Sequence, residues 1–100
     1  MNIEFYNNKA FIQIDNKLDE PGVKLFKMDF DFLEKDTKIK EVILDFRKIT
    51  QVSSSGLGKL LYLYRYTKNN KVKITFTNVN SALKNLFQSV KMDILFNIEF

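Results

Sequence analysis

The residues best suited to chemistry lie in one short stretch, Ser53-Ser54-Ser55-Gly56-Leu57-Gly58, which we call the serine turn. It follows a strongly apolar segment and precedes a helical pattern. A helix start leaves backbone N–H groups unpaired and carries partial positive charge, so it stabilises an anion such as phosphate. In open parallel sheets, binding sites gather at the carboxyl ends of strands. The glycines would let another surface approach the backbone closely. The turn is therefore a candidate site for an anion or a partner.

A purely structural interpretation of the serine turn is also open. Ser53 or Ser54 would cap the helix, because serine is a preferred N-cap residue. The two glycines would then relieve crowding where the helix meets the sheet. The turn has neither the G-x-x-x-x-G-K-[ST] arrangement of a phosphate-binding loop nor the G-x-S-x-G arrangement of a nucleophile elbow.

Catalysis has little support in the composition. The chain has no histidine and no cysteine, so a Ser-His-Asp triad, a reactive thiol and a cysteine zinc site cannot be built from it. Asp29 and Asp31 are two residues apart in a helical pattern and would point to different faces, which disfavours a metal or acid–base pair. We predict a protein that is not an enzyme, with no catalytic residue, no metal and no cofactor.

Length and charge define the class of protein. One hundred residues with 45% hydrophobic and 28% charged residues indicate a single globular domain over residues 1–100. Neither a signal peptide nor a membrane-spanning run is present, so we expect a cytoplasmic protein without membrane insertion. The net charge is +4, but the basic residues are interleaved with acids. The densest basic groups, residues 35–40 and 68–73, are interpreted as solvated turns, and no nucleic-acid binding is expected.

Hydrophobic periodicity predicts alternating strands and helices. Residues 3–6 and 10–15 read as a hairpin, and residues 41–46 as a buried central strand. A helix from Pro21 to about Leu33 lies between them. A second helix runs from the serines to about Asn69, followed by a strand over residues 72–76, a helix capped by Asn78 or Asn80, and a short strand near residues 96–98. The order is ββαβαβα, with a final strand, which predicts an α/β domain with a mixed four- to five-stranded sheet and covering helices.

On two predicted helices, some apolar residues either pack inside the domain or contact another molecule. The spacing on the second helix turns Leu57, Leu60, Leu61 and Tyr64 inward. Tyr62, Leu63 and Tyr66 lie off that stripe and either half-cover the sheet edge or join Arg65 in a partner surface. On the first helix, three further apolar residues either pack inside the domain or form the face of a weak homodimer: Leu25, Met28 and Phe32.

The stretch from Asp45 to Leu61 resembles the STAS-domain signature, D-L-S-x-V-x-x-I-D-S-S-G-L-G-x-L-L. Residues 16–19 match the family's G-x-L-D before the first helix, with Asn16 in place of glycine. Residues 72–79 match the strand before the last helix, and residues 91–98 resemble the G-L-D-x-L-F-x-I ending. Ser53 occupies the position of the acid that precedes the serine pair. The resemblance spans nearly the whole chain in register.

This resemblance implies a STAS fold and a role like that of the bacterial anti-sigma factor antagonists. These signalling proteins bind an anti-sigma factor that is also a serine kinase, release the sigma factor for transcription, and are phosphorylated on the serine before the glycine. At the matching positions that serine is Ser55, with Ser54 as the alternate acceptor. The partner contact would involve Ser53, Ser54, Gly56, Leu57, Gly58 and Tyr62. The alternatives are a non-phosphorylated STAS scaffold, a transporter-associated subunit, or a binder of a small phosphate ligand.

Overall fold

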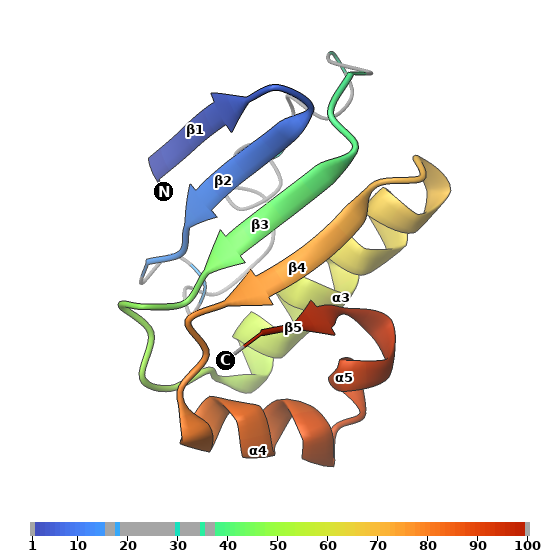
Figure 1. The fold of residues 1–100 in the computed structure, drawn as a ribbon. Helices are drawn as coiled ribbons and strands as arrows, with labels where there is room; N and C mark the ends of the chain where they lie inside the picture. The colour runs from blue at the N-terminus through green and yellow to red at the C-terminus, as the bar shows by residue number, and fades with distance from the viewer. Residues whose placement is uncertain (1, 16–17, 19–29, 31–34, 36–37, 100) are drawn as a thin grey trace.

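A single mixed sheet organises the chain (Figure 1). The structure is a computed structural model and describes residues 2–15, 18, 30, 35 and 38–99. Its strands occur in the order β1-β2-β3-β4-β5 across the sheet. Their bounds are β1 Asn2–Tyr6, β2 Lys9–Gln13, β3 Glu41–Asp45, β4 Lys73–Thr77 and β5 Asn97–Ile98. Within the described residues the helices with defined bounds are α3 Ser54–Asn69, α4 Ser81–Ser89 and α5 Met92–Leu95. The predicted α/β class and mixed sheet are confirmed, with five strands.

Strand pairing places several loops at one edge of the sheet. β1 and β2 are antiparallel, while β2–β3, β3–β4 and β4–β5 are parallel. Asn7 turns the predicted hairpin with φ 54°, a left-handed conformation that asparagine tolerates. Parallel strands β2, β3 and β4 all end at what we call the carboxyl edge. Pairing continues there through the Ile14 N–H to the Asp45 carbonyl and the Phe46 N–H to the Thr77 carbonyl, both at 3.0 Å.

The sheet buries one face and leaves the other partly open. Alternate residues of β2 and β3 enter the core, among them Ile12, Val42 and Leu44, each no more than 1% exposed. The intervening residues of β3, including Ile43, are only half-buried. The predicted central position of β3 is confirmed, but one of its two faces is half-buried where a buried strand was expected. The helix α3 lies across the buried face, behind β3 and β4 in Figure 1.

Four phenylalanines form the centre of the core. Phe46 follows β3, Phe76 lies in β4, Phe87 in α4, and Phe96 just before β5, and each is at most 4% exposed. The Phe76 ring lies 4.8 Å from Phe46, 5.3 Å from Phe87 and 4.5 Å from Phe96, measured between ring centroids. Offset and edge-on ring contacts of this kind add to the stabilisation from burial. This aromatic cluster joins β3, β4, α4 and the C-terminal segment.

The inner face of α3 differs from the predicted one. Its buried residues are Gly56, Lys59, Leu60, Leu63 and Thr67. Leu61 is 38% exposed, whereas Leu63 is fully buried, so the predicted placements of these two leucines are both wrong. Leu61 is about 100° around the helix from Leu60, which turns it away from the sheet. The Thr67 hydroxyl is satisfied by donating to the Leu63 carbonyl at 2.9 Å.

Two other regions bear on the sequence predictions. The helix predicted from Pro21 to Leu33, with Leu25, Met28 and Phe32 as a second face, lies outside the described residues except for Phe30, which is buried. The short helix α5 was not predicted; it brings Met92 into the core just before β5.

The aromatic cluster gives a stability prediction. We expect Phe76→Ala to lower the free energy of unfolding by about 3–5 kcal/mol, because it removes the ring that contacts three others. Phe11→Ala is the matched control on the open sheet face, where the ring is 39% exposed, and should have a much smaller effect. Urea unfolding monitored by circular dichroism measures both. Equal losses for the two variants would contradict the central position of Phe76.

Candidate functional site

Ser53 caps α3. Its backbone is extended, with φ −79° and ψ 171°, and its Oγ accepts a hydrogen bond from the Gly56 N–H at 3.2 Å. The Leu57 N–H donates to the Ser53 carbonyl at 2.9 Å, which closes the first helical turn. The sequence left Ser53 and Ser54 as alternative caps, and the structure selects Ser53. The position that holds an acid in the STAS signature thus keeps a capping oxygen, without the charge.

The other two serines occupy the first two helical positions. The Ser54 residue is exposed, whereas Ser55 is half-buried and Gly56 is buried. The first turn of α3 contains no acidic residue. Negative charge is stabilising in the first turn of a helix, so a phosphate on either serine would be compatible with the helix itself.

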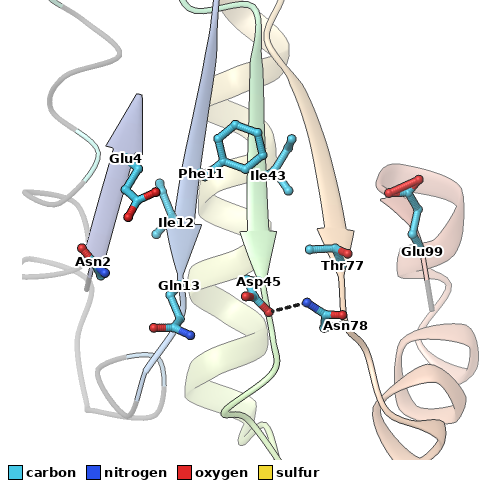
Figure 2. A pocket seen from close by; sticks show the side chains of 10 residues that line it. All are labelled: Asn2, Glu4, Phe11, Ile12, Gln13, Ile43, Asp45, Thr77, Asn78 and Glu99. Carbon is cyan, nitrogen blue, oxygen red and sulfur yellow. Dashed lines mark hydrogen bonds between the residues drawn. The ribbon is translucent and has the colours of Figure 1, made fainter. Parts of the chain in front are cut away.

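The loop before the serine turn is fixed to the sheet by Asp45. Its Oδ1 accepts from the Arg47 N–H at 2.9 Å and from the Asn78 side-chain amide at 3.0 Å (Figure 2). Phe46 and Ile49 are buried, and the Ile49 N–H donates to the Phe46 carbonyl at 2.9 Å. Asp45, the first residue of the signature, therefore positions the loop and ties it to the end of β4.

Asn80 joins the same loop to α4. Its Oδ1 accepts from the Leu83 N–H at 2.8 Å and caps α4, while its Nδ2 donates to the Ile49 carbonyl at 3.3 Å. Of the two predicted caps, Asn80 is the one used. Asn78 adopts a left-handed φ of 57° and binds Asp45 instead.

A groove of about 300 Å³ opens between this loop and α4. Thr50, Gln51, Val52, Ala82, Leu83 and Leu86 line it. Because Val52 precedes the capping residue Ser53, the groove adjoins the serine turn. Its mixture of aliphatic side chains and two polar rim residues can receive an apolar side chain of a partner.

The outer face of α3 continues the surface of the serine turn. Ser54, Gly58, Leu61 and Arg65 are exposed and recur at helical spacing, so they form one stripe, which we call the outer stripe. Ser55 and Tyr62 are seven residues apart on one flank of this stripe, and both are half-buried. Leu57 lies on the other flank and packs against the core. The predicted contact residues thus lie along the first half of α3, with Gly56 buried beneath them. Leu61 was predicted to face the core, so it was not among the predicted contact residues.

Gly58 is not required by the packing of the described chain. A Cβ added there would meet no heavy atom of the described residues within 4 Å. The interpretation that glycine relieves crowding therefore does not hold for Gly58 within this part of the chain. A glycine inside a helix costs about 0.5–1 kcal/mol relative to alanine, so its presence favours close approach by another molecule.

A separate hollow lies on the open face of the sheet (Figure 2). Its volume is about 470 Å³, and it is lined by Asn2, Glu4, Phe11, Ile12, Gln13, Ile43, Asp45, Thr77, Asn78 and Glu99. Three of these are carboxylates, so the hollow disfavours a phosphate ligand. It includes no residue of the serine turn.

The described residues contain no group of three or more acidic, histidine or cysteine side chains placed to hold a metal ion. None of the helices described is long and apolar enough to cross a membrane.

The capping geometry yields a direct prediction. Ser53→Ala removes the acceptor of the Gly56 N–H and should lower the free energy of unfolding by about 1 kcal/mol. Ser53→Asp restores an acceptor and adds negative charge at the helix start, so its stability should equal or exceed that of the wild type. Thermal unfolding at low ionic strength compares the three proteins. Equal stability of the alanine variant and the wild type would show that the cap does not contribute.

The open space around the Cα of Gly58 gives a second prediction about stability. Gly58→Ala should raise the free energy of unfolding by about 0.5–1 kcal/mol, because alanine favours the helix and meets no neighbour among the described residues. Chemical denaturation measures the change. A destabilised Gly58→Ala protein would show that the fold itself needs this glycine.

Comparison with known proteins identifies the family. The family model of the STAS domain matches residues 1–99. Among solved structures, the NMR structure of the protein TM1081 has a TM-score of 0.79 at 15% identity, over 96% of this chain and 77% of that one. A structure described as the molecular architecture of the stressosome, a signal integration and transduction hub, has a TM-score of 0.77 at 17% identity, over 99% and 87% of the two chains. No curated protein matches. The two structures share the fold, and the family match shows that the chain belongs to the STAS-domain family.

Proposed function

We propose that this STAS domain is a regulatory binding protein that contacts an anti-sigma factor with serine kinase activity, and that phosphorylation of Ser55 ends the contact. The contact surface comprises the serine turn, the outer stripe of α3 and the groove beside Val52. The observation that carries the proposal is the surface at the start of α3. There the exposed Ser53 and Ser54 lie near the exposed Leu61 and near Gly58, which the packing of the described residues does not require. Such a switch would operate in the bacterial cytoplasm, where sigma factors act.

The charge balance of the helix start supports a switch of binding without unfolding. With no acid in its first turn, α3 can accept a phosphate there without repulsion from a neighbouring carboxylate of that turn. A phosphoserine adds about −1.5 to −2 charges and a bulky, strongly hydrated group. A partner surface that packs against the bare turn would have to desolvate this group. The unfavourable energy therefore falls on the contact rather than on the fold.

The two candidate acceptors differ in accessibility. Ser54 is exposed, and Ser55 is half-buried at the flank of the outer stripe. The family resemblance assigns the phosphate to Ser55, with Ser54 as the alternate. A kinase that modifies Ser55 must reach a less accessible hydroxyl, so its own contact with the outer stripe is part of substrate recognition. Binding and phosphorylation would then share one surface.

Ser53 stands where the family signature has an acid, and it can replace the capping oxygen of that acid but not its charge. The Ser53 hydroxyl keeps the cap, so the helix start retains its geometry. The missing charge leaves the serine turn less negative than in the family signature. We infer that Ser53→Asp would speed phosphorylation if the kinase uses the acid, and would leave the rate unchanged if the acid serves only as a cap.

The test uses the partner kinase, first isolated by pull-down from the source cell and then purified. Incubation with ATP should place phosphate on the peptide that contains Ser54 and Ser55, as located by mass spectrometry. Ser55→Asp should weaken binding at least about tenfold in isothermal titration calorimetry, or about 1.4 kcal/mol. Asn8→Asp is the matched control, because it adds the same charge in the exposed hairpin turn.

Two outcomes would contradict the proposal. One is the absence of phosphate from the peptide of the serine turn. The other is equal partner affinity of Ser55→Asp, Asn8→Asp and the wild type. Binding that survives without any phosphorylation would favour the alternative function, a STAS scaffold that uses the same surface permanently. The half-buried position of Ser55 and the lack of an acid at Ser53 are the observations that favour that alternative.

A further inference from the structure

The two lysine-rich groups of the sequence meet at the end of the sheet opposite the serine turn. Parallel strands β3 and β4 begin there, and we call this end the amino edge. The Lys73 N–H donates to the Lys40 carbonyl at 2.9 Å, and the Lys40 N–H donates to the Asn8 carbonyl at 2.8 Å. The register also places Glu41 between Lys9 and Lys73 on neighbouring strands. Segments that are more than thirty residues apart thus form one basic edge.

Most of this positive charge is not neutralised within the described part of the chain. Glu41 pairs with Lys9 at 3.5 Å and accepts from the Thr75 hydroxyl at 2.7 Å. No described carboxylate forms an ion pair with four other lysines of this end, all of them exposed: Lys40, Lys68, Lys71 and Lys73. These four charges give the amino edge a positive potential that attracts an acidic partner.

An apolar groove of about 330 Å³ adjoins the basic edge, between the C-terminal half of α3, β4 and the segment α5–β5. Its lining consists of Tyr64, Thr67, Lys68, Val72, Lys73, Ile74, Ile94, Leu95, Phe96 and Asn97. Ile94 is 76% exposed, the largest exposure among the large hydrophobic side chains of the described chain. Lys68 and Lys73 belong to both the groove and the basic edge.

The positive charge of the groove lies directly beside its aromatic wall. The Lys68 ammonium lies over the Tyr64 ring, 5.8 Å from its centroid. The Tyr64 ring in turn packs edge-on against Phe96, with 5.6 Å between ring centroids. A cation over the face of an aromatic ring is attracted to it by about 0.5–1 kcal/mol at an exposed site. The groove is thus prepared to receive a carboxylate and an aliphatic group side by side.

We propose that this amino-edge groove binds an acidic segment of a partner protein, with an aliphatic side chain seated between Tyr64 and Ile94. Its carboxylates would pair with Lys68, Lys71 and Lys73. Charge complementarity selects an acidic partner, and the apolar lining selects a peptide over a ligand that offers only phosphates. The site lies at the other end of α3 from the serine turn, so both surfaces can be occupied together. This inference does not depend on the phosphorylation switch.

The test is an NMR titration of the full ¹⁵N-labelled chain with a short synthetic peptide of glutamates around two central leucines. We expect saturable shifts of the amides of residues 68–73 and 94–97, and an affinity that falls as salt is raised. A peptide with serines in place of the leucines should bind at least about tenfold more weakly, since it cannot fill the groove.

Substitutions in the groove show which of its residues contribute to the affinity for the peptide. Lys68→Gln combined with Lys73→Gln should weaken the leucine peptide at least about tenfold, and Ile94→Ser should weaken it several-fold. Arg47→Gln combined with Lys48→Gln is the matched control, because it removes the same charge from exposed residues at the carboxyl edge. The control should bind as the wild type does.

Several results would overturn the proposal. One is the absence of saturable peptide binding at peptide concentrations up to about 1 mM. Another is a set of amide shifts confined to the serine turn. Equal binding of the serine peptide, of a short single-stranded DNA or of anionic phosphatidylglycerol vesicles would show that the edge attracts anions without using the groove. Equal weakening by the carboxyl-edge control would show that net charge alone decides.

Discussion

The contact of Phe46 with Phe76 and Phe87 is the interaction on which the candidate site depends. Phe46 is the first residue after β3, and its burial fixes where the loop to α3 leaves the sheet. Phe87 belongs to α4, so the same cluster sets α4 beside that loop. The hydrogen bond between Asp45 and Asn78 then secures the start of the loop, and the one from Asn80 to the Ile49 carbonyl secures its middle. At the end of this loop Ser53 and Ser54 are exposed, while Ser55 is half-buried and Gly56 is buried.

The order of the described strands and of the helices α3 and α4 was predictable because the local signals agree with one another. Alternating apolar residues indicated the strands, paired asparagines indicated turns, and serine or asparagine indicated helix starts. The face of α3 was less predictable, since Leu60 and Leu61 are equally apolar and only the packed sheet distinguishes them. The half-buried second face of β3 had the same cause, because an apolar sequence cannot show which of its residues face the core. The helix α5 is too short to have a periodic signal.

The two candidate sites differ in how much of each could be predicted from the sequence. The serine turn is a continuous motif, so its residues were identified together, although the choice of Ser53 as cap needed the backbone. The amino edge could not be identified in this way, because it exists only once β3 and β4 are paired and Lys40 lies beside Lys73. Its apolar groove also requires α5, which was not predicted. The two proposed surfaces lie at opposite ends of the parallel strands.

We propose that the start of α3 and its outer stripe form the surface that the partner kinase contacts. Amide hydrogen exchange of the chain, alone and in complex with the purified partner kinase, locates this surface. We expect slowed exchange at residues 53–58 and along the outer stripe as far as Arg65, with little change at the open sheet face around Phe11 and Ile43. Slowed exchange confined to that sheet face, with the serine turn unaffected, would contradict it.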